Sequence, residues 1–184
     1  VTGDLSSFET FKDFFEAYKR QLKYFLNLKI EANKKIQKIY AEHLPVPLLS
    51  LVIEDCIDNA TDYNAGGARY DTAYIQGVGL GTMADALTSI KFNVFDKSNF
   101  SLEELVSALD RDFEGSGGIL EQIGEDTPKY GNDIDYADDL MQQAFEALFE
   151  IVDGRPNGRG GTYRVNMLPT TVHVYFGSLI GATA

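Results

Sequence analysis

The sequence contains one cysteine, Cys56, and no tryptophan. One thiol cannot form an internal disulfide or a cysteine-rich metal site, so we expect a reducing, cytoplasmic environment. Basic side chains are also few: 16 Lys and Arg stand against 28 Asp and Glu, and the net charge is −12. This balance argues against binding to nucleic acid, whose phosphates require Lys and Arg. No apolar run approaches the length of a membrane span, so no membrane association is expected.

The residues that are present suit a folded domain. Hydrophobic residues make up 44% of 184, and 12 Phe and 10 Tyr can bury a large apolar area. No repeat and no linker rich in Pro or Ser divides the chain, so residues 1–184 are predicted to form a single segment of one domain. The chain starts at Val1 and stops after an apolar, strand-like run, which indicates a piece of a longer protein.

Helical periodicity is strongest in the first third of the chain. Ser6 and Glu9 have the spacing of a capping box, and a long amphipathic helix is predicted from there to about His43. Pro45 ends the pattern, because proline removes a backbone donor and clashes with the preceding turn. The apolar segment at 48–58 predicts a second, shorter helix.

The rest of the chain alternates helical and strand-like patterns, which predicts the α/β class. Ser101 and Glu104 form another capping box. Helices are expected at 82–95, 101–113 and 133–152, with one further turn at 119–123. Strands are expected at 69–78, 162–167 and 170–176, and a flexible glycine-rich loop at 158–161.

Two patterns resemble ligand-binding motifs but lack the residues that decide them. Residues 77–81 hold three glycines between a strand and a helix, yet Thr82 stands where a dinucleotide fingerprint needs Gly or Ala. A tight turn explains these glycines better. The aspartates that begin the helix near Asp133 resemble a calcium loop, but Asp138 replaces its glycine and Ala144 its final glutamate. Caps on a helix N-terminus are the simpler interpretation.

No self-contained catalytic set is visible. The two histidines, His43 and His173, are far apart in sequence, and no pair has the spacing of a zinc site, so no metal is predicted. His173 sits in a strand pattern, either as a buried wall residue or as part of a pocket lining. Cys56 follows Glu54 and Asp55, whose charges raise a thiol pKa, so it is interpreted as core packing.

Several runs, taken together, resemble the glycyl radical enzyme family, which includes the pyruvate formate-lyase-like proteins. The similar runs are residues 47–57, 62–70, 74–79, 127–133 and 161–171. Their order and spacing cover essentially the whole chain. The resemblance implies that residues 1–184 supply helices and a few strands of the family's ten-stranded α/β barrel.

The resemblance also implies that the radical chemistry lies elsewhere. The family uses a glycine in an Arg-Val-x-Gly-aromatic motif, a cysteine that becomes a thiyl, and in dehydratases a glutamate two residues later. Here Arg164 and Val165 begin such a motif but Met167 replaces the glycine, and Asp58 stands two residues after Cys56. No catalytic residue is therefore expected in this chain.

By the same resemblance, the family binds no organic cofactor during turnover. Its glycyl radical is installed by a separate radical S-adenosylmethionine activating enzyme, and the proteins are usually homodimers that work without oxygen. Family strands corresponding to the one entered through Pro169 face the substrate. Thr171 is the first candidate for substrate binding and Thr170 the second, since strand register decides which side chain points inward. His173 is a third candidate. Both threonines could equally be ordinary strand residues.

Three functions remain open. The first is a lyase that removes water from a hydroxylated amino acid by thiyl-initiated hydrogen abstraction. The second is another family branch, a glycerol or propanediol dehydratase or a formate acetyltransferase. The third is a non-catalytic relative, which would be a compact monomer, whereas a slice of a barrel would expose strand edges and associate.

Overall fold

The computed structural model describes residues 3–167, and every structural statement below concerns these residues. They divide into two compact units. The first unit comprises residues 3–21 and 78–147, and the second comprises residues 22–77 and 148–167. Two helices, α1 (Phe11–His43) and α6 (Asp135–Val152), contribute residues to both units. The units are described in turn.

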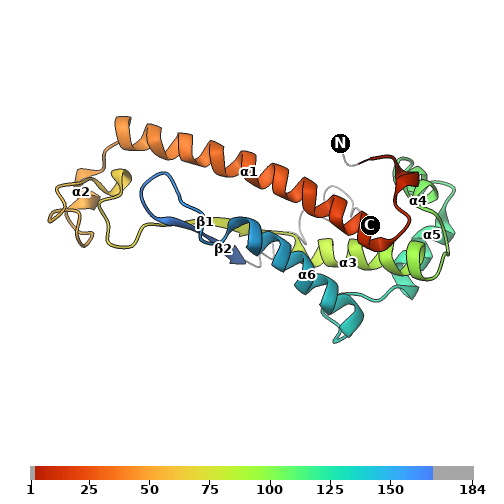
Figure 1. Ribbon diagram of the computed structural model, residues 1–184. Coiled ribbons are helices and arrows are strands. Elements are labelled where there is room, and N and C mark those ends of the chain that lie inside the picture. Colours follow the sequence, from red (N-terminus) through yellow and green to blue (C-terminus); the bar gives the residue numbers. More distant parts are fainter. Residues whose placement is uncertain (1–2, 168–184) are drawn as a thin grey trace. The chain divides into compact units, whose positions relative to one another are not determined.

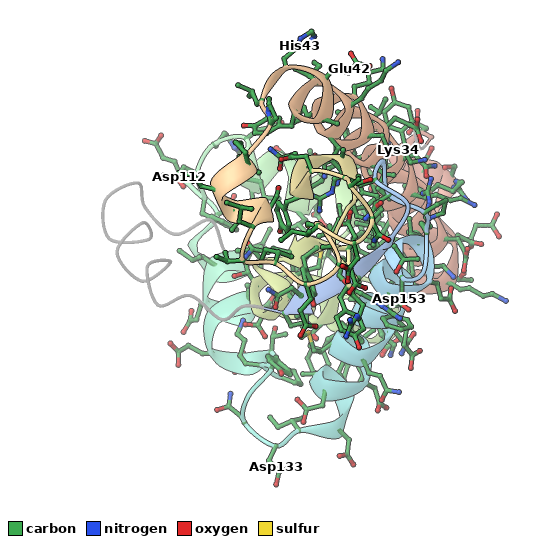
Figure 2. All side chains as sticks on the ribbon, turned by 90° about the vertical axis from the view of Figure 1, so that its left-hand side faces the viewer. Lys34, Glu42, His43, Asp112, Asp133 and Asp153 are labelled. Atoms are coloured by element: carbon green, nitrogen blue, oxygen red, sulfur yellow. The ribbon has the colours of Figure 1, made fainter. Side chains whose placement is uncertain are left out.

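Helix α1 ends at His43 as predicted, but its capping box is not the predicted one. The Thr10 hydroxyl accepts from the Asp13 N–H at 3.2 Å, and the Asp13 carboxylate accepts from the Thr10 N–H at 3.0 Å. Ser6 instead belongs to a short 3-10 turn, η1 (Leu5–Ser7), capped by Asp4. Thr10 directly precedes the continuous helix and Asp13 lies in its first turn, so the pair satisfies two backbone donors at the helix start. Figure 2 shows Glu42 and His43 at the C-terminal end of α1.

The first unit contains most of the helices that lie between residues 78 and 152. The helices predicted at 82–95, 101–113 and 133–152 are confirmed, with shifted ends. The capping box at Ser101 and Glu104 is also confirmed, with bonds of 3.1 and 2.8 Å. In chain order the elements are α3 (Leu80–Ser89), the π-helix η3 (Ile90–Asp96), α4 (Leu102–Leu109), α5 (Gly117–Glu121), the π-helix η4 (Gln122–Asp126) and the first part of α6.

A fully buried amide connects the two π-helices. The Asn93 amide group donates to the Ser89 carbonyl at 3.1 Å and to the Thr127 hydroxyl at 2.8 Å. Thr127 in turn donates to the Gln122 carbonyl at 2.8 Å, and Asn99 donates to the Asn93 side-chain oxygen at 2.8 Å. A buried polar side chain costs free energy unless it is paired, so this network fixes the wider helical turns. The apolar core of this unit includes Phe100, Leu105, Ala108, Phe113 and Ile123.

The glycines at 77–81 serve a turn, as the sequence indicated. Gly79 has φ +79° and caps the N-terminus of α3. A side chain there would be strained, because this left-handed backbone favours glycine. This geometry supports the interpretation as a tight turn and gives no support to a dinucleotide site.

In the second unit the predicted helix at 48–58 is wrong. Only α2 (Pro47–Ser50) is helical, and turns follow it as far as the 3-10 turn η2 (Tyr63–Ala65). Asp55 and Ala60 have φ values of 72° and 47°, which no continuous helix contains. The apolar run satisfied a helical pattern, but polar contacts to more distant residues hold the backbone in turns.

Two strands of this unit lie side by side (Figure 1), β1 (Thr72–Gly77) and β2 (Thr162–Met167). They pair in parallel with Thr72 opposite Thr162 and Gly77 opposite Met167. The strand predictions for these segments are confirmed, and the α/β class with them. Two parallel strands can be joined only by a long crossover segment. Here that segment is residues 78–161, which include the helices from α3 to α6. The described residues contain two strands; the predicted strand at 170–176 lies outside them.

Candidate functional site

The carboxyl ends of β1 and β2 lie at one edge of the sheet, because the strands are parallel and Gly77 pairs with Met167. Ligand sites in parallel α/β folds form at this kind of edge. The predicted substrate residues Thr170, Thr171 and His173 come next in the sequence after β2. They lie outside the described residues, so their role stays a prediction.

A buried ion pair holds the approach to both strands. Asp71 directly precedes β1, and its carboxylate pairs with the Arg159 guanidinium at 2.5 Å. The two side chains are only 8% and 16% exposed, so little water screens the pair. This contact ties the loop before β2 to the start of β1.

Asn157 completes this clamp. Its side-chain oxygen accepts from the backbone N–H groups of Arg159 at 2.8 Å and Gly161 at 3.0 Å, and its amide group donates to the Asp71 carbonyl at 3.2 Å. The segment at 158–161 is a loop, as predicted. The backbone N–H groups of Gly158, Arg159 and Gly161 are paired and the arginine is anchored, so these contacts hold the loop, which we call the fixed entrance to β2.

Glycines allow the close backbone approach in this clamp. A Cβ on Gly161 would lie 1.6 Å from the Asp71 carbonyl oxygen, and one on Gly66 would lie 2.1 Å from that of Arg159. Both distances are far below any van der Waals contact. The glycines at 66 and 161 therefore allow a backbone contact that a side chain would block.

Helix α1 supports the same loop from within the second unit. The Gln37 side-chain oxygen accepts from the Gly158 N–H at 2.7 Å, and Asn27 accepts from Arg155 at 2.5 Å. The Arg155 carbonyl accepts from the N–H of Tyr163, which is fully buried in β2, at 2.7 Å. The strand that leads to Thr170 and Thr171 therefore starts from a position held by several independent contacts.

A second polar cluster, in the first unit, joins η3 to α6. The Lys91 ammonium lies 2.7 Å from the Asp96 carboxylate and 3.0 Å from the Tyr136 hydroxyl, and Tyr136 donates to Asp96 at 2.6 Å. Burial, followed by the bond to Asp96, raises the pKa of Tyr136 to about 12. The phenol stays protonated near neutral pH and cannot act as a base there, so the cluster joins two elements rather than performing catalysis.

Cys56 is buried, 3% exposed, as its interpretation as core packing required. Burial raises the pKa of its thiol, and the charges of Asp62 and Asp55 raise it further. Since the thiolate is the reactive form, Cys56 is a poor nucleophile.

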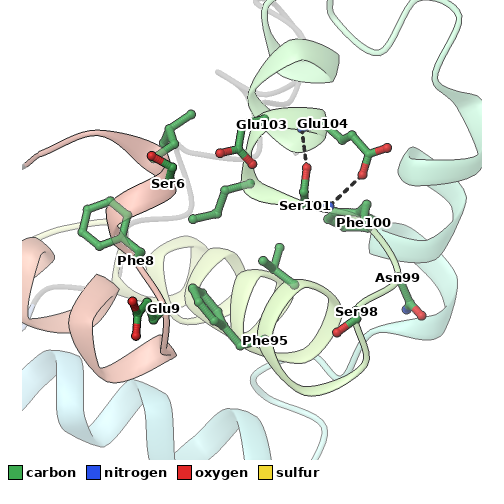
Figure 3. A pocket seen from close by; sticks show the side chains of 13 residues that line it. Ser6, Phe8, Glu9, Phe95, Ser98, Asn99, Phe100, Ser101, Glu103 and Glu104 are labelled. Carbon is green, nitrogen blue, oxygen red and sulfur yellow. Dashed lines mark hydrogen bonds between the residues drawn. The ribbon is translucent and has the colours of Figure 1, made fainter.

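The first unit contains a pocket of about 430 Å³, between the N-terminal segment and the start of α4 (Figure 3). Its charged lining consists of the carboxylates Glu9, Glu103 and Glu104, and no Lys or Arg lines it among the described residues. These carboxylates favour a cationic or neutral group over an anionic one.

Sequence reasoning missed the clamp of Asp71, Asn157 and Arg159. The local sequence gives only a weak signal, an arginine between two glycines. The carboxylate is 88 residues away along the chain, and no local pattern identifies it.

A family model described as pyruvate formate lyase-like matches residues 1–177. This chain belongs to that family. The resemblance drawn from the sequence runs is thereby confirmed. None of the helices described between residues 3 and 167 combines the length and hydropathy needed to cross a bilayer.

The curated relatives of this pyruvate formate lyase-like chain include dehydratases, and isethionate sulfite-lyases as well. It is 53% identical to trans-4-hydroxy-L-proline dehydratase of Clostridioides difficile over 182 residues, which is 99% of the chain and 23% of that protein. It is 30% identical to (2S)-3-sulfopropanediol dehydratase of Klebsiella oxytoca over 177 residues, which is 96% of the chain and 21% of that protein. The chain thus spans less than a quarter of the length of these relatives.

Solved structures agree with this family membership. The crystal structure of hydroxyproline dehydratase from Clostridioides difficile with its substrate bound has a TM-score of 0.92 at 53% identity, covering 99% of this chain and 23% of that one. The glycerol-bound, B12-independent glycerol dehydratase from Clostridium butyricum has a TM-score of 0.89 at 34% identity, covering 98% and 23%. Both are larger enzymes of which this chain matches one part.

Proposed function

We propose that the chain is part of a glycyl radical lyase that dehydrates trans-4-hydroxy-L-proline. The observation that carries this proposal is the 53% identity to the hydroxyproline dehydratase across 99% of the chain. The sulfopropanediol dehydratase and the glycerol dehydratase match at only 30% and 34%. Since all these proteins share the frame, the excess identity to one of them favours its substrate.

In the parent protein, the glycyl radical and the thiyl derived from it would supply hydrogen-atom abstraction. This chain would contribute to the wall of the substrate pocket. A threonine hydroxyl at position 171, or at 170, would hydrogen-bond the substrate's hydroxyl or carboxylate, and His173 would line the same pocket. Holding a reacting carbon in place is worth up to about 7–11 kcal/mol of barrier in favourable cases, so a rigid strand is an advantage.

The fixed entrance to β2 supports this role. The ion pair of Asp71 with Arg159, the hydrogen bonds of Asn157, and the contacts from α1 all precede the strand that leads toward Thr170. A pocket-wall strand works best when its starting point does not move. The clamp is thus a positioning device for the proposed site.

The proposal includes the family's requirements. The parent would need a radical S-adenosylmethionine activating enzyme with an iron–sulfur cluster, would bind no organic cofactor during turnover, and would be a cytoplasmic, anaerobic homodimer. Its remaining barrel strands, thiyl cysteine and radical glycine would lie outside residues 1–184.

The test is the activity of the full-length protein, activated without oxygen and offered trans-4-hydroxy-L-proline, glycerol or propanediol in separate assays. We expect water loss from hydroxyproline and none from the diols. Turnover of a diol would favour the diol dehydratase branch instead. A reading frame without a Gly-Cys-x-Glu run and an Arg-Val-x-Gly-aromatic motif would leave a non-catalytic relative.

A further inference from the structure

The loop that leads into β2 contains the only Asn–Gly pair of the sequence, Asn157–Gly158. Asparagine is chemically most labile before glycine, because no side chain hinders the glycine nitrogen from attacking the asparagine side chain. In that reaction the Gly158 nitrogen bonds to Cγ of Asn157, the Cγ–Nδ2 bond breaks, and the proton of the attacking nitrogen leaves with the amide as ammonia. Water then opens the five-membered imide and leaves aspartate or isoaspartate at position 157.

The clamp favours an amide side chain at position 157. The Asn157 oxygen Oδ1 accepts from the N–H groups of Arg159 at 2.8 Å and Gly161 at 3.0 Å. Its nitrogen Nδ2 donates to the Asp71 carbonyl at 3.2 Å and lies 3.5 Å from an oxygen of the Asp71 carboxylate. Asn157 is only 8% exposed, so water cannot readily replace a bond lost here. Only an amide both accepts and donates in this way, which explains the asparagine.

Position 158 favours glycine for a different reason, the close approach of α1. A Cβ on Gly158 would lie 2.8 Å from the Gln37 side-chain oxygen and 3.2 Å from the Lys34 carbonyl oxygen. The second oxygen belongs to the helix backbone, so it cannot rotate away as a side chain can. The contacts of two neighbouring positions therefore bring a labile pair into the loop.

The side chain of Gln37 opposes the reaction of this pair. The two donors on Oδ1 of Asn157 polarise the side-chain carbonyl, which by itself favours attack on it. The N–H of Gly158, however, donates to the Gln37 side-chain oxygen at 2.7 Å. This bond exists only while the nitrogen keeps its proton, so it disfavours the deprotonated nitrogen that attacks. The same bond attaches the loop to α1.

We propose that Asn157 is a latent deamidation site, which Gln37 keeps unreacted in the folded protein. The product would weaken the clamp. A carboxylate at position 157 would place an oxygen where Nδ2 now donates, facing two acceptor oxygens of Asp71, and the two carboxylate charges would repel each other. All of these groups lie in the second unit, and the inference does not depend on which substrate the parent protein takes.

The test follows deamidation at residue 157 of the full-length protein by peptide mass spectrometry in a mildly alkaline buffer. The native wild type should react at least about tenfold more slowly than the urea-unfolded protein, because the loop must open first. Gln37→Ala should speed the native reaction by about fivefold, the factor that corresponds to one lost hydrogen bond. Gln37→Glu keeps an acceptor and should stay slow. Ser101→Ala, which removes a helix cap in the first unit, controls for general destabilisation and should also stay slow.

Equal rates in the native and unfolded wild type would overturn the proposal, and this comparison needs no variant to fold. A Gln37→Ala rate no faster than that of Ser101→Ala would also overturn it.

The effect on the clamp is measured with Asn157→Asp, which has the side chain of one deamidation product. Asn157→Asp should lower the urea midpoint of the full-length protein. The drop should be smaller in the Asp71→Asn background, where the second carboxylate is gone and Arg159 is free to pair with the new one. Equal drops in both backgrounds would overturn the inferred repulsion.

Discussion

Buried polar side chains carry the most information at the scale of single residues. Asp71 and Arg159 are largely shielded from water and form an ion pair, and the geometry of the loop before β2 depends on both side chains. Removing one partner leaves the other buried without its counter-charge, which costs more than the pair contributes.

Asp71→Asn should lower the stability of the full-length protein by about 3–5 kcal/mol, the range found when one partner of a buried ion pair is removed. Urea unfolding followed by circular dichroism measures it. The double variant Asp71→Asn with Arg159→Met should recover part of the loss, because the stranded charge is gone. A double variant as unstable as the sum of both single variants would contradict this account.

Cys56 should react slowly with alkylating reagents. It is buried and the pKa of its thiol is raised, so we expect iodoacetamide at pH 8 to modify it at least about tenfold more slowly in native than in urea-unfolded protein. Peptide mass spectrometry separates this site from other cysteines of the parent. Rapid native labelling would show that the thiol is accessible.

The Tyr136 cluster should make stability depend on alkaline pH. The folded-state pKa of about 12 lies above the usual tyrosine pKa of 10.0, so this contribution is present below pH 10 and is lost as pH rises toward 12. The pKa of Lys91 is raised too, because its bonds to Asp96 and Tyr136 outweigh its burial. Between pH 9 and 11.5 the wild type should lose more of its urea midpoint than Tyr136→Phe. Parallel losses would argue against the cluster.

At the scale of elements, helix starts depend on which capping pair lies next to the continuous apolar pattern. Ser6–Glu9 and Ser101–Glu104 have the same spacing, but only the second forms a capping box. Thr10 and Asp13 cap α1 in place of the first.

The two serines therefore form a matched pair for mutation. Ser101→Ala should lower the stability by about 1 kcal/mol, the usual value of an N-cap hydroxyl, and Ser6→Ala by less than about 0.5 kcal/mol. Urea midpoints of the two variants, measured side by side, test this. Equal losses would mean that Ser6 also contributes to a helix start.

At the scale of the whole molecule, the proposed activity makes a prediction for residues 170 and 171. Side chains alternate between the two faces of a strand, so if the strand predicted at 170–176 forms, Thr170 and Thr171 would point to opposite faces. We expect Thr171→Val to lower kcat/KM for trans-4-hydroxy-L-proline by about tenfold or more, since one substrate hydrogen bond is lost. Thr170→Val serves as its control and should have little effect. Equal activity in both variants would support the interpretation as ordinary strand threonines.

The sequence by itself determined the family, the long helix ending at His43, both paired strands and the capping box at Ser101, because each depends on residues that are close along the chain or on whole runs. It also identified Cys56 as a core residue from its neighbours. Only the tertiary structure decided that the clamp joins Asp71 to Arg159, that contacts with distant residues hold the loop at 158–161, and that turns replace the helix predicted at 48–58. These features depend on partners far away in sequence, such as Asp62 for Ser50, and local periodicity contains no information about such contacts.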